Sequence, residues 1–146
     1  MTGGSAPNLT YRFTVPGIPG VKAAAEHVPT ARGFRKKKNE KTDRFENRVA
    51  MAARFANVPY AEKGVPVALG VCAYWPTRNP RKTKPRPEEY KTTRPDMTNV
   101  IKAVEDGLTG VAYHDDSQVV RYLPEMKKVY AAQGEAPRVV VRIVQL

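Results

Sequence analysis

The most constraining feature of the sequence is the apolar run Val65–Trp75, which reads VPVALGVCAYW. It is too short to cross a membrane, where about 20 apolar residues are needed. It is partly β-branched, and Pro76 and a basic stretch follow it, so it predicts a buried β-strand. Cys72 lies inside this run as the chain's single cysteine, which excludes an internal disulfide and a zinc cluster and indicates a core thiol.

Two segments have the apolar spacing of helices. From Thr42, the stretch TDRFENRVAMAARFA predicts a first helix, with Thr42 or Asp43 as N-cap. Met97–Thr109 predicts a second helix with one apolar face, and Gly110 is suited to close it in a left-handed conformation.

The remaining elements are expected to be strands. Tyr11–Val15 alternates and is then broken by a segment rich in Pro and Gly. HDDSQVVRYL (114–123) and RVVVRIVQL (138–146) predict two strands, paired antiparallel and joined near Gly134. The expected order is β-α-β-α-β-β, an α/β fold of the α+β type in which two main helices pack on a mixed sheet as a two-layer sandwich.

The length of 146 residues and the hydrophobic content of 41% predict one domain spanning residues 1–146. The first residues, MTGGSAPNLTYRF, lack the apolar stretch of a secretory signal, and no run is long enough to span a membrane. We therefore expect a soluble, cytoplasmic protein of a bacterial or phage-infected cell, with no membrane partner.

The chain carries 25 Lys and Arg against 14 Asp and Glu, a formal charge of +11, so nucleic acid is the favoured partner. The charge concentrates in two expected loops, about residues 17–41 and 76–95. The alternative is that these loops are solvated and bind nothing. The candidate DNA-binding residues are Arg35, Lys36, Lys37, Lys38, Arg78, Arg81, Lys82, Lys84, Arg86, Lys91 and Arg94.

Carboxylates gather around the second helix in this basic chain. Asp96 stands at its start, and Asp115 and Asp116 follow it after a short turn. Carboxylate oxygens are the ligands that Mg²⁺ and Mn²⁺ prefer, and a divalent ion would let an acidic cluster approach phosphates. In a regular strand Asp115 and Asp116 would point to opposite faces, so Asp116 is the favoured ligand. The alternative is that Asp96 caps the helix and the Asp115–Asp116 pair forms a polar turn.

The polar stripe of the helix carries Asn99, Lys102 and Asp106, at i, i+3 and i+7, with Glu105 at its margin. From the helix pattern alone, the favoured interpretation of Lys102 is an ordinary exposed lysine paired with Glu105 or Asp106.

The stretch RPDMTNVIKAVEDGLTGVAYHDDSQVV, with FTVPGIPGVK near the N-terminus and the closing PRVVVRI, resembles the RusA family of Holliday-junction resolvases, often carried by phages and prophages. Its specific part is PD-x-x-N-x-x-K, followed about twenty residues later by DDSQV. The resemblance implies a homodimeric endodeoxyribonuclease that binds four-way DNA junctions and nicks paired strands with Mg²⁺ or Mn²⁺. The family's metal-binding aspartates would be Asp96 and Asp116, with Asp115 adjacent, and its essential lysine would be Lys102.

One position departs from the family's commoner run PD-x-D-N, because Thr98 stands where a second aspartate is expected. Either the site uses fewer anionic ligands, or Asp106 or Glu105 supplies the charge. A different class of function also remains open: a basic nucleic-acid-binding protein with the same fold and a degraded metal site. His114, Tyr74 and Trp75 are weaker candidates, with a turn role expected for His114 and core or interface roles for the two aromatic residues.

Overall fold

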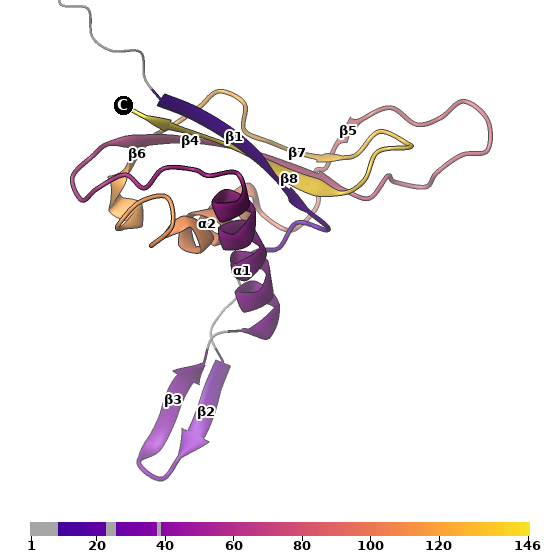
Figure 1. The fold of residues 1–146 in the computed structure, drawn as a ribbon. Helices are drawn as coiled ribbons and strands as arrows, with labels where there is room; N and C mark the ends of the chain where they lie inside the picture. The colour runs from indigo at the N-terminus through magenta and orange to yellow at the C-terminus, as the bar shows by residue number, and fades with distance from the viewer. Residues whose placement is uncertain (1–8, 23–25, 38) are drawn as a thin grey trace, which may run out of the picture.

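The computed structural model describes residues 9–22, 26–37 and 39–146. Its main feature is a mixed sheet with two helices below it (Figure 1). The strands run in the spatial order β1-β8-β4-β7-β5, and β6 also pairs with β4. Their bounds are β1 Leu9–Pro16, β4 Val67–Trp75, β5 Glu89–Tyr90, β6 Val119–Tyr122, β7 Lys127–Tyr130 and β8 Arg138–Gln145. The α+β class with two main helices on a mixed sheet is confirmed.

Strand β4 is the centre of the sheet. It pairs antiparallel with β8 along one edge and parallel with β6 and β7 along the other. All nine of its residues are buried, as predicted for Val65–Trp75. Val67, Leu69 and Val71 belong to the main core with the helices, whereas Cys72 and Tyr74 belong to a smaller cluster.

The predicted antiparallel pairing of segments 114–123 and 138–146 is wrong. Only Val119–Tyr122 of the first segment is a strand, and it pairs with β4 in parallel. Strand β8 instead lies between β1 and β4. The chain between β6 and β7 is held against β4 by three bonds: the Leu123 N–H donates to the Leu69 carbonyl at 2.9 Å, the Cys72 thiol donates to the Glu125 carbonyl at 3.0 Å, and the Val71 N–H donates to the Met126 sulfur at 3.0 Å.

Helix α1 spans Glu40–Phe55 and helix α2 spans Met97–Leu108. The cap of α1 is Asn39, whose side chain accepts from the N–H groups of Lys41 and Thr42, so the predicted cap at Thr42 or Asp43 is wrong. The Thr42 hydroxyl instead donates to the Val21 carbonyl at 3.0 Å.

The two helices meet at a glycine. A Cβ atom at Gly107 would lie 2.8 Å from Cβ of Val49 and 2.9 Å from the Glu46 carbonyl oxygen, so glycine permits the close packing of α2 on α1. The end of α2 is as predicted, since Gly110 follows it with φ +84°.

The first basic segment is not the continuous loop that was predicted. Glu26–Thr30 (β2) and Gly33–Lys37 (β3) form an antiparallel hairpin below the helices, closed by a turn with Gly33 at φ +121° (Figure 1). Arg35, Lys36 and Lys37 therefore lie in a strand, and Lys38 lies outside the described residues. The second segment, residues 76–95, is irregular apart from β5.

Among the described residues, neither helix has the length and apolar character that crossing a membrane would require.

Candidate active site on helix α2

The two faces of α2 divide as its sequence predicts. Val100, Val104 and Leu108 are fully buried in the core. Asn99 and Lys102 are exposed and Asp106 is half-buried on the opposite side. The helix therefore presents a polar stripe to solvent while its apolar face fixes its position under the sheet.

Lys102 is the centre of the polar stripe. Its ammonium nitrogen lies 2.5 Å from Oδ2 of Asp116 and 3.4 Å from Oδ1 of Asp106. Because one nitrogen contacts both, these two carboxylate oxygens lie no more than about 6 Å apart. The hydrogen bond to Asp116 is the main cause of the raised pKa of Lys102, so this lysine is held in its charged form.

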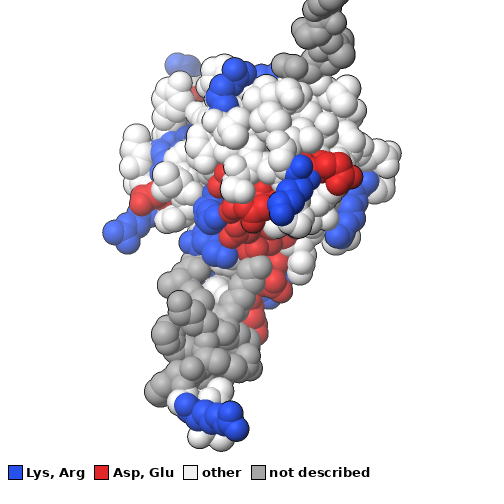
Figure 2. All heavy atoms as spheres, turned by 90° about the vertical axis from the view of Figure 1, so that its left-hand side faces the viewer, with Lys and Arg blue, Asp and Glu red and all other residues white. Residues whose placement is uncertain are grey.

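Lys22 extends this network from the segment after β1. Its ammonium lies 2.9 Å from Oδ2 of Asp106 and 4.0 Å from Oε2 of Glu46 in α1. Its backbone N–H donates to the Asn99 carbonyl at 3.0 Å, which ties the segment to α2. The acidic side chains gather in the middle of one face of the molecule, with lysine and arginine around them (Figure 2). A pocket of about 290 Å³ on this network is lined by Lys22, Glu46, Asp106, Thr109, Asp115 and Asp116.

The turn that carries Asp116 is irregular, and this separates the roles of the two consecutive aspartates. Asp116 begins a short 3₁₀ helix, η1 (Asp116–Gln118), and Asp115 caps it by accepting from the Ser117 N–H at 3.0 Å. Bonds from Ser117 lower the pKa of Asp115. The alternative of a capped polar turn thus holds for Asp115, whereas Asp116 turns to Lys102.

Gln118 fixes this turn, although no role was predicted for it. Its side-chain oxygen accepts from the N–H groups of His114 and Asp115 at 2.8 and 2.9 Å. Its amide nitrogen donates to the carbonyls of Ala61, Glu62 and Val65 at 3.3, 2.9 and 3.1 Å. This buried side chain therefore links the Asp116 turn to the chain before β4, and its place in the DDSQV motif was the available signal.

Glu105 lies under the polar stripe. It is buried, and burial raises the pKa of its carboxyl while the Tyr122 hydroxyl donates to it at 3.2 Å. Its backbone carbonyl accepts from the buried Tyr113 hydroxyl at 2.7 Å. Glu105 is thus part of the floor of the site and contacts β6 instead of Lys102.

Asp96 occupies a different position at the start of α2. It is the N-cap residue, yet its side chain makes no capping bond, so the capping alternative is wrong for Asp96. Among the described residues its exposed carboxylate has no hydrogen bond or ion pair. It lines a pocket of about 530 Å³ with Arg94, Pro95 and Asn99, and this pocket shares no lining residue with the one that contains Asp116.

Lys128 of β7 holds the segment before Asp96, and it too was missed in the sequence. Its ammonium donates to the Thr93 and Pro95 carbonyls, both at 2.6 Å. Both acceptors are backbone groups more than 30 residues away, so no side-chain motif could have revealed the contact.

Asp96, Asp106, Asp115 and Asp116 offer carboxylate oxygens as donors for a metal. In the portion of the chain that the structure describes, no three Asp, Glu, His or Cys side chains are grouped to hold an ion. Mg²⁺ is commonly held by only one or two carboxylates together with substrate phosphates, so this oxygen donor set fits a hard divalent cation. Thr98, the departure from the family motif, is exposed on the first turn of α2 near Asp96.

The predicted DNA-binding residues of the second loop fall into two groups. Arg86 and Lys91 are engaged within the protein: Arg86 pairs with Glu89 at 3.0 Å, and Lys91 lies over the rings of Trp75 and Tyr130. The other five are exposed: Arg78, Arg81, Lys82, Lys84 and Arg94. Gln133 supports this loop by accepting from the N–H groups of Arg81 and Arg86, each at 3.0 Å.

Trp75 and Tyr74, two of the three weaker candidates, are buried. Trp75 is buried in the main core, and Tyr74 lies between Lys127 and Arg138, whose charged groups are 5.2 and 3.8 Å from its ring centre. His114 is exposed beside the Asp116 turn.

Comparison with known proteins agrees with the motif. The family model for endodeoxyribonuclease RusA matches residues 18–144, which include α2 and the Asp116 turn. The chain belongs to the RusA family.

One relative of this RusA-family chain is the crossover junction endodeoxyribonuclease rusA of Lactococcus phage r1t. It is 36% identical over 86 residues, which are 58% of this chain and 59% of the relative. Another is the uncharacterized protein YqaN of Bacillus subtilis (strain 168), 39% identical over 85 residues, 53% of this chain and 56% of the relative. The matched regions thus span somewhat over half the length of these curated relatives.

Proposed function

We propose that this RusA-family chain is a divalent-metal-dependent endodeoxyribonuclease that resolves four-way DNA junctions by paired nicking. The observation that carries the proposal is the direct contact of Lys102 with Asp116 across 14 residues of sequence. These are two of the residues to which the family resemblance assigns catalysis. Their contact lies on a face flanked by exposed cations, which is a setting suited to chemistry on DNA phosphates. The phage r1t relative, named a crossover junction endodeoxyribonuclease, supports the same substrate class.

Asp96 and Asp116 are the proposed ligands of Mg²⁺ or Mn²⁺, with Asp115 adjacent. Such an ion supplies Lewis-acid stabilisation of charge on phosphorus and lowers the pKa of a bound water. Asp96 is suited to this role because its carboxylate has no contact within the described chain that would have to be broken. Asp116 must exchange its contact with Lys102, while Asp106 remains beside the lysine as its partner.

Lys102 is the proposed electrophilic group. Its charge is maintained by two carboxylates, and its side chain is about half exposed, so it can meet a phosphate oxygen or the leaving oxygen of the cut strand. Asp106 then acts as its positioning partner. Asn99, one turn before Lys102 and beside Asp96, is placed to donate a hydrogen bond to the DNA backbone.

DNA contacts are proposed for the exposed cations of the second loop and for the hairpin residues Arg35–Lys37 with Lys38. Removal of one phosphate contact should reduce the slope of log K against log salt by about 0.9. We expect joint replacement of Arg78, Arg81, Lys82 and Lys84 by Gln to flatten the slope by roughly 2 to 4. Replacement of Arg86 and Lys91, which are engaged within the protein, should change the slope much less.

This salt dependence can be measured by fluorescence anisotropy with a labelled junction. Equal slopes for the fourfold variant and the wild type would contradict the proposed role of the loop.

Two copies of the chain are proposed to act together. A four-way junction presents equivalent strands across its centre, and paired cuts require two active sites related by a twofold axis.

The reaction class is tested by incubating the protein with a synthetic four-way junction and with a linear duplex of matched sequence, with Mg²⁺, with Mn²⁺ and with a chelator. Paired nicks confined to the junction, and dependent on the metal, are the expected result. Salt-sensitive junction binding without strand scission under every condition would instead support the non-catalytic DNA-binding alternative.

A further inference from the structure

Residues 16–22, called the connector below, follow β1 and complete the motif FTVPGIPGVK. Beyond Pro16, the last residue of β1, the connector has no helix or strand. Irregular surface segments are ordinarily mobile, whereas this one is bonded along its length to both helices. The proposed function gives the connector no task, and its last residue, Lys22, indicates one.

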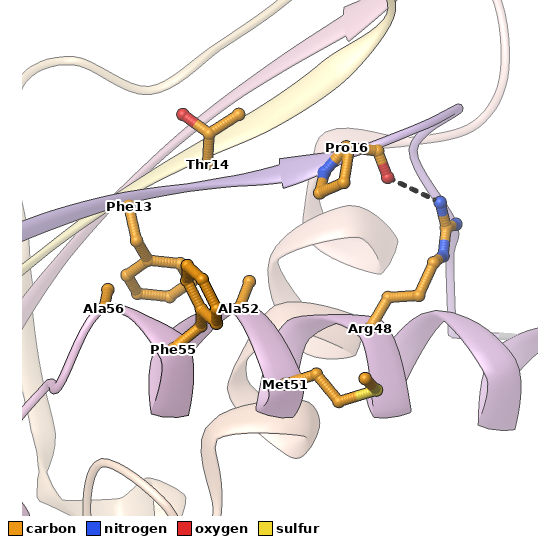
Figure 3. Close-up of a pocket in the computed structure, with 8 residues that line it drawn as sticks. All are labelled: Phe13, Thr14, Pro16, Arg48, Met51, Ala52, Phe55 and Ala56. Carbon is orange, nitrogen blue, oxygen red and sulfur yellow. Dashed lines mark hydrogen bonds between the residues drawn. The ribbon is translucent and has the colours of Figure 1, made fainter.

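Helix α1 fixes the first part of the connector. Arg48 donates to the Pro16 carbonyl at 2.8 Å and to the Ile18 carbonyl at 3.1 Å. Figure 3 shows the guanidinium of Arg48 extending from α1 to the carbonyl at the end of β1. A Cβ atom at Gly20 would collide with the Phe45 side chain of the same helix, so this glycine lets the backbone lie directly on α1.

The end of the connector is fixed by both helices. The Thr42 hydroxyl of α1 donates to the Val21 carbonyl at 3.0 Å. The backbone N–H of Lys22 donates to the Asn99 carbonyl of α2, also at 3.0 Å. Lys22 is therefore held beside the polar stripe of α2 by its own backbone, whatever its side chain contacts.

The side chain of Lys22 binds the carboxylate that Lys102 also contacts. The Lys22 ammonium lies 2.9 Å from Oδ2 of Asp106, whereas the Lys102 ammonium lies 3.4 Å from Oδ1. Two lysines therefore hold the two oxygens of one carboxylate. Oε2 of the buried Glu46 lies 4.0 Å from the Lys22 ammonium, so two acidic groups attract this lysine toward the protein.

We propose that Lys22 is a positioning residue of the nuclease, which holds Asp106 and through it Lys102. This role rests on the proposed function, in which Asp116 exchanges its contact with Lys102 for the metal ion. With Oδ2 occupied by Lys22, Asp106 offers Lys102 a single oxygen, and the Lys102 ammonium keeps donors for a phosphate oxygen. Without Lys22, the second oxygen of Asp106 would draw Lys102 inward, and its less compensated charge would repel the DNA backbone.

The test is a double-mutant cycle on the single-turnover cleavage rate of the full chain at saturating junction, with wild type, Lys22→Met, Asp106→Asn and the double variant. We expect Lys22→Met to slow cleavage about tenfold. It should have no further effect in the Asp106→Asn background, because Lys22 acts through that carboxylate. Lys22→Arg should restore part of the rate. The matched control is Lys41→Met, which removes an exposed lysine at the start of α1 and should leave the rate unchanged.

Thermal unfolding of the same four variants without metal gives a readout that is independent of activity. We expect Lys22→Met to lower Tm by about 2–4 °C in the wild-type background and by much less in the Asp106→Asn background. Equal falls in Tm in the two backgrounds would show that Lys22 does not hold Asp106. If Lys22→Met fails to fold, Lys22→Gln takes its place in both cycles.

The junction assay separates the role of Lys22 from the proposed function. Equal rate losses from Lys22→Met in both backgrounds would overturn the positioning role, since Lys22 would then act without Asp106. A fall of about 0.9 in the salt slope of junction binding would also overturn it, because Lys22 would then contact a phosphate directly. An active wild type with an equally fast Lys22→Met variant would overturn the role of Lys22 and leave the nuclease intact. A wild type that cuts no junction with either metal would overturn the proposed function and this role together.

Discussion

The two loops that carry Asp96 and Asp116 are held in opposite ways. The Asp116 turn is fixed by Gln118, a neutral side chain, 7% exposed, that makes five hydrogen bonds. The Asp96 segment is fixed by Lys128, a half-buried cation that makes two hydrogen bonds to backbone carbonyls. The Gln118 bonds are therefore part of the buried core, whereas the Lys128 bonds hold a single loop at the surface.

The carboxylates themselves show the same contrast. Asp116 is compensated by Lys102, while Asp96 faces solvent without a bonded partner among the described residues. Substitutions in the Asp116 turn should therefore lower both stability and activity, and substitutions in the Asp96 segment should lower activity alone.

The largest effect is expected from the carboxylates. Asp96→Asn and Asp116→Asn should each reduce junction cleavage at least about a thousandfold, about 4 kcal/mol in the barrier, because each removes a proposed metal ligand. Junction binding should be retained. Asp96→Asn should leave the melting temperature unchanged, and Asp116→Asn should lower stability by roughly 0.5–1 kcal/mol, the value of a partly exposed ion pair.

Single-turnover cleavage, anisotropy and thermal melting together check this prediction. Full activity in Asp96→Asn would remove Asp96 from the metal site.

The next effect is on folding stability. Gln118→Leu should destabilise the protein by about 3 kcal/mol. It leaves buried N–H and carbonyl groups without hydrogen-bond partners, and each such group costs about 1–3 kcal/mol. This corresponds to a fall in Tm of roughly 10 °C. The matched control is Gln133→Leu, which removes a comparable amide clamp from a more exposed loop and should cost about 1 kcal/mol. Equal losses in the two variants would show that the Asp116 turn is not held from the core.

A smaller effect, on rate only, is expected from Lys128→Met. Release of the Thr93 and Pro95 carbonyls should displace Asp96 and reduce kcat roughly tenfold, with little change in KM for the junction or in Tm. Lys128→Arg should restore part of the rate, since a guanidinium can also donate to both carbonyls.

The control is Lys127→Met, which removes an exposed ion pair with Glu88 from the adjacent residue. An equal fall in kcat for Lys128→Met and Lys127→Met would show that the loss of a surface charge causes the effect, and it would contradict a positioning role for Lys128.

The smallest effect concerns Thr98. Thr98→Asp restores the commoner family residue, two positions after Asp96, and should lower the metal concentration for half-maximal cleavage several-fold by adding an anionic ligand. A metal titration of the cleavage rate measures it. If Thr98→Asp and Asp106→Asn both abolish activity, the result would indicate that Asp106 supplies the additional metal ligand.

The sequence predicted the elements whose patterns are long and regular. Val67–Trp75 and Met97–Leu108 were located within one or two residues, because one is continuously apolar and the other has a clear helical face. The pairing of the segments that contain β6 and β8 was predicted wrongly and β7 was not predicted, since strand pairing depends on which edges of β4 are available after the chain has folded. The hairpin of β2 and β3 was missed because its charged residues resemble a solvated loop.

The chemistry of the site divides in the same way. Asp96, Lys102 and Asp116 were singled out by the resemblance to the RusA family, and Asp106 by its place on the polar stripe of α2; in the structure Lys102 contacts both Asp106 and Asp116. Gln118, Lys128 and Lys22 were missed because their roles depend on carbonyls and carboxylates distant in sequence. The family motif includes the residues proposed for the site, whereas the groups that hold the loops in place become visible only with the fold.

The pairing of β1 with β8 joins residues from opposite ends of the described chain, with Leu9 opposite Gln145. Strand β4 also requires β8 along one of its edges, so the sheet is incomplete until residues 138–145 have been synthesised. A nascent chain would therefore expose β1 and β4 until then, and such high contact order favours slow closure and assistance by chaperones. Truncation before Arg138 should yield an aggregating chain instead of a smaller folded one.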